Sequence, residues 1–256
     1  MKKAFIFWPL KAKESEPELE PSDATEFDYS EISDPTLPED KTQTIGGFIA
    51  VNPEGKIIDI SKWQGTINFD KLAPEVALVI ARASCGSDKD IKIDEYAEAM
   101  MEHDIPFGVY CYSYAGDATK AKDEAQKLVQ YASKYNPIFY VMDAEEAKIT
   151  NAAIKAFAQE LRKQTNAKIG CYVAHNRYEA YKYSTVKDLF DFTWIPRYGK
   201  NNGTIEGATK PAYPCDLWQY TSTAKIAGIS GNVDMNVLTG DGHDIEWFLT
   251  NDVTVG

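Results

Sequence analysis

The sequence has few of the residues that build metal sites. Only four cysteines and three histidines occur in 256 residues, and no two cysteines form a CxxC pair. Zinc sites use cysteine and histidine at such close spacing, so we expect no metal site. Cys85, Cys111 and Cys171 lie in or at the ends of apolar runs, which is typical of small buried side chains. A disulfide between two of them stays open, since it depends on where the protein matures.

Long apolar runs and an excess of positive charge are also missing. No run approaches the roughly 18 residues of a membrane-spanning helix, so we expect no membrane span. The 27 lysines and arginines against 39 acidic residues give a formal net charge of −12, which argues against nucleic acid as a partner. No GxGxxG or Walker loop follows an apolar run, which disfavours a nucleotide-binding sheet.

The first 55 residues concentrate the acidic charge. They hold 5 lysines, 12 acidic residues and 6 of the 12 prolines. Such a segment buries too little apolar surface to offset its ordering entropy, so we predict a flexible acidic N-terminal segment over residues 1–54. Lys2 and Lys3 precede a short apolar run that is weakly similar to a secretion signal, but Pro9 interrupts the run and no small-residue cleavage site follows. The export route therefore stays open.

From residue 55 onward, short apolar runs alternate with helical patterns. Runs of four or five residues suit strands that are buried on both faces, and they occur at residues 57–60, 77–81, 107–110, 138–142 and 169–173. Asp117 or Thr119 is placed to start one helix, and Thr150 or Asn151 to cap another. Helical signals then shrink to residues 176–182, and strands are indicated at residues 192–195, 216–220 and around Val233. This alternation predicts an α/β fold, either an open doubly wound sheet or a closed barrel. The missing nucleotide loops and the strand-rich end favour an irregular TIM-like barrel over residues 55–250, helical in its first five units and strand-rich in its last three, with a C-terminal tail at 251–256.

Four carboxylates fall at positions that could carry chemistry. Groups that react in a parallel α/β barrel sit at the carboxyl ends of strands, and Asp59, Asp143, Glu145 and Asp234 end or interrupt the apolar runs. If its strand persists, Asp143 points to the same side as Glu145, with Cα atoms about 6.6 Å apart. Like charges raise at least one pKa, as glycosidic-bond cleavage requires. A solvated acidic cluster at a helix start explains the pattern equally well.

Aromatic side chains accompany these carboxylates. Aromatic walls beside acids are typical of carbohydrate grooves, although aromatic residues on barrel strands also serve as core. The residues concerned are Tyr110, Tyr112, Tyr114, Tyr172, Trp194, Tyr198, Trp218 and Tyr220.

Five segments in this order resemble one known family, glycoside hydrolase family 25, the Chalaropsis-type lysozymes. They are Asp59-Ile60-Ser61-Lys62-Trp63-Gln64-Gly65, Asp143-Ala144-Glu145, Trp194-Ile195-Pro196-Arg197-Tyr198-Gly199, Trp218-Gln219-Tyr220-Thr221-Ser222 and Gly228-Ile229-Ser230-Gly231-Asn232-Val233-Asp234-Met235-Asn236. The resemblance spans residues 56–249. It implies a lysozyme, an N-acetylmuramidase that cleaves the β-1,4 bond between N-acetylmuramic acid and N-acetylglucosamine on a (β/α)5β3 barrel.

The resemblance also implies roles for particular residues. Glu145 would be the general acid and base, Asp143 would orient or stabilise the reacting centre, and Asp59 and Asp234 would complete an acidic floor. The groove residues would be Tyr112, Tyr172, Trp194, Arg197 and Gln219. We expect net retention with help from the substrate's acetamido group. We further expect no metal or organic cofactor, bacterial peptidoglycan strands as partner, action at the cell wall, and a monomer.

Two departures and two alternatives accompany this interpretation. Cys111 and Pro196 stand where many members carry other residues, which puts the groove's shape in question. A non-catalytic peptidoglycan-binding module, or a barrel glycosidase acting on another N-acetylated glycan, would use the same architecture. No wall-binding repeat is recognised after the barrel, and a phage endolysin and a bacterial autolysin are not distinguished.

Overall fold

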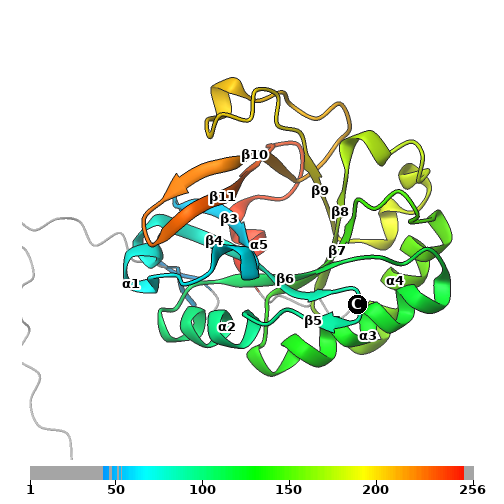
Figure 1. Cartoon of the computed structure of the whole chain (residues 1–256), viewed down its shortest axis with the longest axis horizontal. Coiled ribbons are helices and arrows are strands. Elements are labelled where there is room, and N and C mark those ends of the chain that lie inside the picture. The colour runs from blue at the N-terminus through cyan, green and yellow to red at the C-terminus, as the bar shows by residue number, and fades with distance from the viewer. Residues whose placement is uncertain (1–42, 46–47, 51, 53, 251–256) are drawn as a thin grey trace, which may run out of the picture. The chain divides into compact units, whose positions relative to one another are not determined.

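The structure, a computed structural model, describes residues 43–45, 48–50, 52 and 54–250 (Figure 1). All of these described residues belong to one compact unit. The predicted secretion-like start, most of the predicted flexible segment and the tail at residues 251–256 lie outside the described residues.

Eight strands form a closed barrel, which confirms the predicted architecture. They are β3 (Lys56–Ile60), β4 (Val76–Cys85), β6 (Phe107–Tyr112), β7 (Phe139–Ala144), β8 (Lys168–Val173), β9 (Phe192–Pro196), β10 (Leu217–Ile226) and β11 (Ile229–Leu238). Neighbouring strands from β3 to β10 pair in parallel, and β11 pairs antiparallel with both β10 and β3. The short β5 (Asp88–Lys89) folds back antiparallel on the end of β4.

Helices cover the first half of the barrel and thin out in the second half. They are α1 (Phe69–Leu72), α2 (Ile93–Glu102), α3 (Ala118–Ala132), α4 (Asn151–Gln164) and α5 (Ile245–Leu249). As predicted, the Asp117 side chain caps α3 and the Thr150 side chain caps α4. The weak helical signal at residues 176–182 forms only the 3₁₀-helix η4 (His175–Arg177) and turns. Lys182 has a φ of 50°, a left-handed conformation that does not continue a helix.

The strands bury apolar residues on both faces, as continuous apolar runs require. The outer face packs against the helices through residues such as Ile58, Val109 and Met142. The inner face packs inside the barrel through Ile57, Leu78, Phe139, Phe192 and Trp194, among others. Gly108 and Gly170 leave the space for two of these rings, because a Cβ at either glycine would lie within 2.3 Å of a carbon of the Phe139 or Phe192 ring.

A hairpin occupies part of the segment predicted to be flexible. Strands β1 (Gln43–Ile45) and β2 (Phe48–Ala50) pair antiparallel, with Thr44 opposite Ile49. Two short strands thus lie inside the segment predicted to be flexible, and the boundary at residue 54 stays a prediction. Eleven of the 12 acidic residues and five of the six prolines in this segment lie before residue 43, and the two strands contain threonine, isoleucine and phenylalanine, which favour strands. The Gly46-Gly47 dipeptide between them is typical of hairpin turns.

Helix α5 closes the barrel at the end where the strands begin. Phe248 is fully buried, and its ring centroid lies 5.9 Å from that of Phe139 and 5.0 Å from that of Phe192. These two partners are the first residues of β7 and β9. Helix α5 is thus part of the barrel core.

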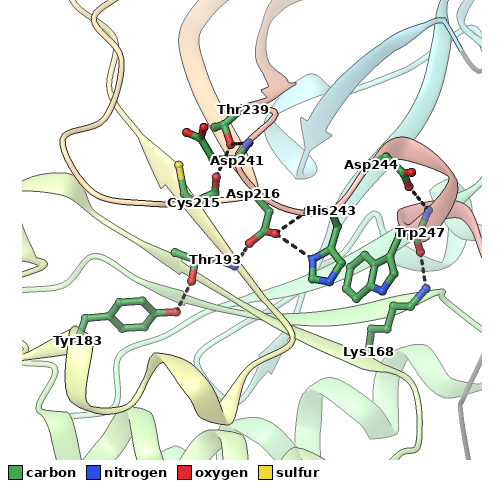
Figure 2. A network of polar contacts seen from close by, with 10 residues as sticks. All are labelled: Lys168, Tyr183, Thr193, Cys215, Asp216, Thr239, Asp241, His243, Asp244 and Trp247. Atoms are coloured by element: carbon green, nitrogen blue, oxygen red, sulfur yellow. Dashed lines mark hydrogen bonds and ion pairs between the residues drawn. The ribbon is translucent and has the colours of Figure 1, made fainter.

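Polar contacts hold this segment in place (Figure 2). One carboxylate, Asp216, accepts hydrogen bonds from the backbone N–H of Thr193 at 2.9 Å and from the backbone N–H of His243 at 3.0 Å, and it contacts His243 Nδ1 at 2.9 Å. The His243 ring stacks on Trp247 with centroids 3.7 Å apart. Lys168 donates to the backbone carbonyl of Trp247 at the end of α5. The segment is therefore tied to β8, β9 and the start of β10.

All four cysteines are free thiols in the structure. The alternative of a disulfide is not realised, and Cys111 and Cys171 are fully buried on the outer face of the barrel. Since Cys111 points toward the helices, its departure from the family pattern does not alter the inner face of the barrel.

Candidate active site

The four predicted carboxyls gather at the carboxyl end of the parallel strands. Asp59 and Asp143 follow Ile57 and Val141 at two-residue spacing on the inner face, and they are only 5% and 6% exposed. Glu145 is the first residue after β7, which extends two residues beyond the predicted run at residues 138–142, and it is half-buried. Asp234 on β11 lies directly opposite Asp59 in the strand register. The negative charge of Glu145 helps to raise the pKa of all three aspartates, so the four form one cluster.

Gln219 holds Asp59 from β10. Its Nε2 donates to Asp59 Oδ2 at 2.9 Å. Its Oε1 accepts hydrogen bonds from the hydroxyls of Tyr172, at 3.0 Å, and Tyr198, at 2.5 Å. Because two hydroxyl donors occupy the amide oxygen, the amide N–H must face Asp59. Gln219 is therefore a fixed donor to this carboxylate.

Asn236 holds the same oxygen from β11. Its Nδ2 donates to Asp59 Oδ2 at 3.0 Å, and its Oδ1 accepts a hydrogen bond from Trp194 Nε1 at 2.8 Å. Trp194 is 2% exposed, so it lies beneath the acids as support. Two amide donors on one oxygen favour the ionised form of Asp59.

Asp59 and Asp234 differ in pKa, because the amide donors stabilise the charge of Asp59. Burial raises the pKa of Asp59 to about 6, against the lowering effect of the hydrogen bonds from Asn236 and Gln219. Burial, the charge of Asp59 and a hydrogen bond with it raise the pKa of Asp234 to about 8. Near neutral pH the pair therefore carries one negative charge, on Asp59, while Asp234 keeps its proton.

This difference predicts a pH-dependent stability for Asp234→Asn. A carboxyl whose pKa rises on folding, here from 3.8 to about 8, stabilises the fold at low pH and loses that contribution as the pH rises through the interval. The free energy of unfolding of the wild type should fall relative to the variant between about pH 4 and pH 8, by a few kcal/mol in total. Urea unfolding across this range measures the difference.

Asp188→Asn is the matched control, because the Asp188 side chain is 85% exposed. If the free energies of unfolding of Asp234→Asn and the wild type differ by the same amount at all pH values, the assignment of the proton to Asp234 is contradicted.

Asp143 and Glu145 provide an acid and a free acceptor. Burial raises the pKa of Asp143 well above its usual value, and the charges of Glu145 and Asp59 raise it further. Among the residues that the structure describes, its buried Oδ1 has no hydrogen-bond partner. Burial also raises the pKa of Glu145, while the Tyr112 hydroxyl opposes the rise. A partly exposed carboxyl of raised pKa beside an unpaired buried carboxyl suits proton donation to a bound substrate.

Arg82 is a site residue that the sequence analysis missed. It follows Leu78 and Ile80 on the inner face of β4 and is 8% exposed. Its Nε donates to Asp90 Oδ2 at 2.7 Å, and its charge lowers the pKa of Asp143. A lone arginine that interrupts a buried apolar run was the available signal. Asn236 was missed too, although its two-residue spacing from Asp234 was visible.

The predicted groove residues lie at two levels. Tyr172, Trp194 and Gln219 are buried in the network below the acids. Tyr112, opposite Asp143 in the register, is half-buried and donates to Glu146 Oε1 at 2.9 Å. Arg197 is half-buried, and its Nη1 donates to the backbone carbonyl of Lys210, which anchors the loop after β9. Their contact with substrate stays a prediction.

Metal sites and membrane-spanning helices are absent from the described part of the chain. No group of three or more His, Cys, Asp or Glu side chains there is arranged to hold a metal ion. No helix among these residues has the length and apolar character needed to cross a membrane.

Comparisons with known proteins agree with this geometry. The sequence profile of Glycosyl hydrolases family 25 matches residues 58–229. The catalytic domain of endolysin ply40 from bacteriophage P40 of Listeria monocytogenes is 32% identical; the match covers 77% of this chain and 98% of that one, with a TM-score of 0.70. No curated protein sequence matches the chain.

Two other solved structures extend the comparison. GHIP, a glycosyl hydrolase 25 of Streptococcus pneumoniae, is 27% identical over 76% of this chain and 91% of that one, with a TM-score of 0.70. A bacterial lysozyme from Streptomyces coelicolor is 18% identical over 79% of this chain and 100% of that one, with a TM-score of 0.62, and it supports the fold alone.

Proposed function

The chain belongs to glycosyl hydrolases family 25, and from this membership we propose that it is a lysozyme-type peptidoglycan hydrolase, an N-acetylmuramidase. Its substrate is the glycan strand of bacterial peptidoglycan, and the bond cleaved is the β-1,4 bond between N-acetylmuramic acid and N-acetylglucosamine. The 32% sequence identity with a phage endolysin domain supports action at the cell wall. We propose further that the chain acts as a monomer without a cofactor.

The observation that carries the proposal is the position of Asp143 and Glu145 two residues apart at the end of β7. A catalytic acid must hold its proton near neutral pH and must be reachable, and Glu145 combines a raised pKa with partial exposure. Asp143 Oδ1 is buried and unpaired, so it is free to accept a hydrogen bond from a substrate N–H. The 2-acetamido group of the substrate offers such a donor.

The proposed reaction runs in two steps. Glu145 gives its proton to the glycosidic oxygen, while the acetamido carbonyl oxygen attacks the anomeric carbon and the bond to the leaving sugar breaks. Asp143 accepts the acetamido N–H and stabilises the positive charge of the resulting oxazolinium ring. Glu145, now a carboxylate, removes a proton from water, which attacks the anomeric carbon and reopens the ring.

Asp59 and Asp234 support this sequence. The single negative charge of the pair lies on Asp59, held by Gln219 and Asn236. A fixed anion stabilises positive charge that develops at the anomeric centre in an oxocarbenium-like transition state. Arg82, by lowering the pKa of Asp143, keeps that group able to become an acceptor when substrate binds.

The function is tested on purified bacterial cell walls. A fall in turbidity shows lysis, and reduction of the digest with borohydride labels the new reducing ends. N-acetylmuramitol as the labelled product supports a muramidase. Labelled N-acetylglucosaminitol would instead show that the chain cleaves the other bond of the strand. Binding of walls without any new reducing ends would identify a non-catalytic binding module.

The stereochemical course gives a separate prediction. Two inversions at the anomeric carbon, one by the acetamido oxygen and one by water, give net retention. We expect the first product seen by proton NMR to be the β-anomer. An initial α-anomer would mean inversion and contradict the mechanism. A sugar trapped covalently on Asp143 would keep retention but would make Asp143 the nucleophile.

A further inference from the structure

Two large apolar side chains project into solvent from neighbouring loops. Trp63 is 77% exposed and Ile91 is 80% exposed, whereas the other strongly exposed large hydrophobic residues among those described, Met101 and Ile205, are 50% and 42% exposed. Trp63 lies in the 3₁₀-helix η1 (Lys62–Gln64) after β3, and Ile91 lies between β5 and α2. Neither contributes to the core, so folding does not explain either residue.

Asp90 joins these two loops and connects them to the site. Its Oδ2 accepts a hydrogen bond from the backbone N–H of Lys62 at 3.2 Å and one from Arg82 Nε at 2.7 Å. Arg82 faces the inside of the barrel beside Asp143. Trp63 follows Lys62 and Ile91 follows Asp90, and Lys62 and Asp90 are joined by a hydrogen bond. Both apolar side chains therefore lie on the rim of the barrel mouth, on the side of β3 and β4.

The loop that carries Trp63 is fixed from both sides. The Gln64 side chain accepts the backbone N–H of Ser61 at 2.7 Å and donates to the carbonyl of Asn232 at 3.2 Å, beside Asp234 on β11. The hydroxyl of Tyr96 on α2 donates to the carbonyl of Gly65. Lys62 Nζ lies 5.1 Å from the centroid of the Trp63 ring and so occupies one side of it. A ring on such a loop is preorganised to bind with its other side.

We propose that Trp63, with Ile91 beside it, forms an outer sugar subsite that binds the glycan strand beyond the two residues flanking the cleaved bond. The inference rests on the proposed function. A pyranose ring presents a face of C–H groups that packs on an indole, while its hydroxyls stay in water. One aromatic ring and one isoleucine suit a sugar better than a protein, since stable protein interfaces bury about 800 Å² on each partner.

Continuity with the acids favours the glycan strand as occupant. Asp59 and Trp63 stand on one strand and the loop that directly follows it, and Gln64 ties that loop to the neighbourhood of Asp234. A strand held at the acids must leave the barrel mouth over its rim. Binding energy from such a remote contact assists the reaction only for substrates that are long enough to reach it.

The test compares substrate lengths and side chains at position 63. Trp63→Ala should lower kcat/KM about 3–10-fold on long, peptide-free glycan strands, the effect of losing one aromatic contact. It should leave the rate on the shortest cleaved oligosaccharide unchanged. Trp63→Tyr, which keeps a ring, should recover most of the loss, and Trp63→Leu should not. Met101→Ala is the control, because Met101 lies near the far end of α2, away from the mouth.

Binding measured without turnover separates this inference from the proposed function. In a Glu145→Gln background, Trp63→Ala should weaken binding of long strands by a similar factor. If the wild type binds long strands through Trp63 but does not cleave them, the proposed subsite is supported and the proposed hydrolase activity is contradicted. Three results would overturn the subsite: an equal loss of kcat/KM on substrates of all lengths, no loss of kcat/KM on long strands, or a dimer of the wild type that Trp63→Ala dissociates.

Discussion

Replacing Glu145 with glutamine is expected to lower the rate of wall lysis by about 10²–10⁴-fold, the usual contribution of a general acid and base. Glutamine keeps the shape of the side chain but has no proton to give to the glycosidic oxygen. Burial raises the pKa of Glu145, so in the wild type the proton is available at higher pH than on an ordinary glutamate. The loss should appear in kcat, since the amide still fits the bound substrate.

Glu146→Gln is the matched control, because the neighbouring carboxylate lies at the same mouth and accepts the Tyr112 hydroxyl. It should retain most of the activity. Circular dichroism and urea unfolding of both variants should match the wild type. Glu145→Gln activity above a tenth of the wild type, or a larger loss in Glu146→Gln, would show that the acid has been assigned to the wrong residue.

The largest effect on stability is expected for Phe248→Ala, at about 3–5 kcal/mol in the free energy of unfolding. The Phe248 ring is fully buried against Phe139 and Phe192 at the closed end of the barrel. Its removal leaves a cavity where the two partner rings lose their contacts. Urea denaturation measures the change from the midpoint and slope of the transition.

Met101→Ala serves as the comparison, because removal of a half-exposed side chain is expected to cost far less than removal of a buried one. The same inner cluster includes Tyr172 and Trp194, which support the acids. We therefore expect the activity of Phe248→Ala to be lost at a lower temperature than that of the wild type. A loss of stability below about 1 kcal/mol would show that α5 is not part of the cooperative core.

The strands were predictable because strands buried on both faces need continuous apolar runs. All eight predicted strand positions are occupied, and Asp117 and Thr150 start the helices as their side chains suggested. The hairpin at residues 43–50 was not predicted, since the charge and proline counts were averaged over the whole first segment. The role of α5 was also not predicted, because a five-residue helix has too short a pattern to indicate what covers it.

The sequence by itself determined the α/β barrel and the four candidate carboxylates, because apolar periodicity and the residues that end each run are local properties of the chain. Only the tertiary structure decided which groups act on one another. Closure of the sheet through β11 and β3 places Asp234 opposite Asp59, and the inner face brings Arg82 and Asn236 to the acids. The pKa of each carboxyl depends on its depth of burial and on neighbours from distant strands, and these exist only after the barrel has closed.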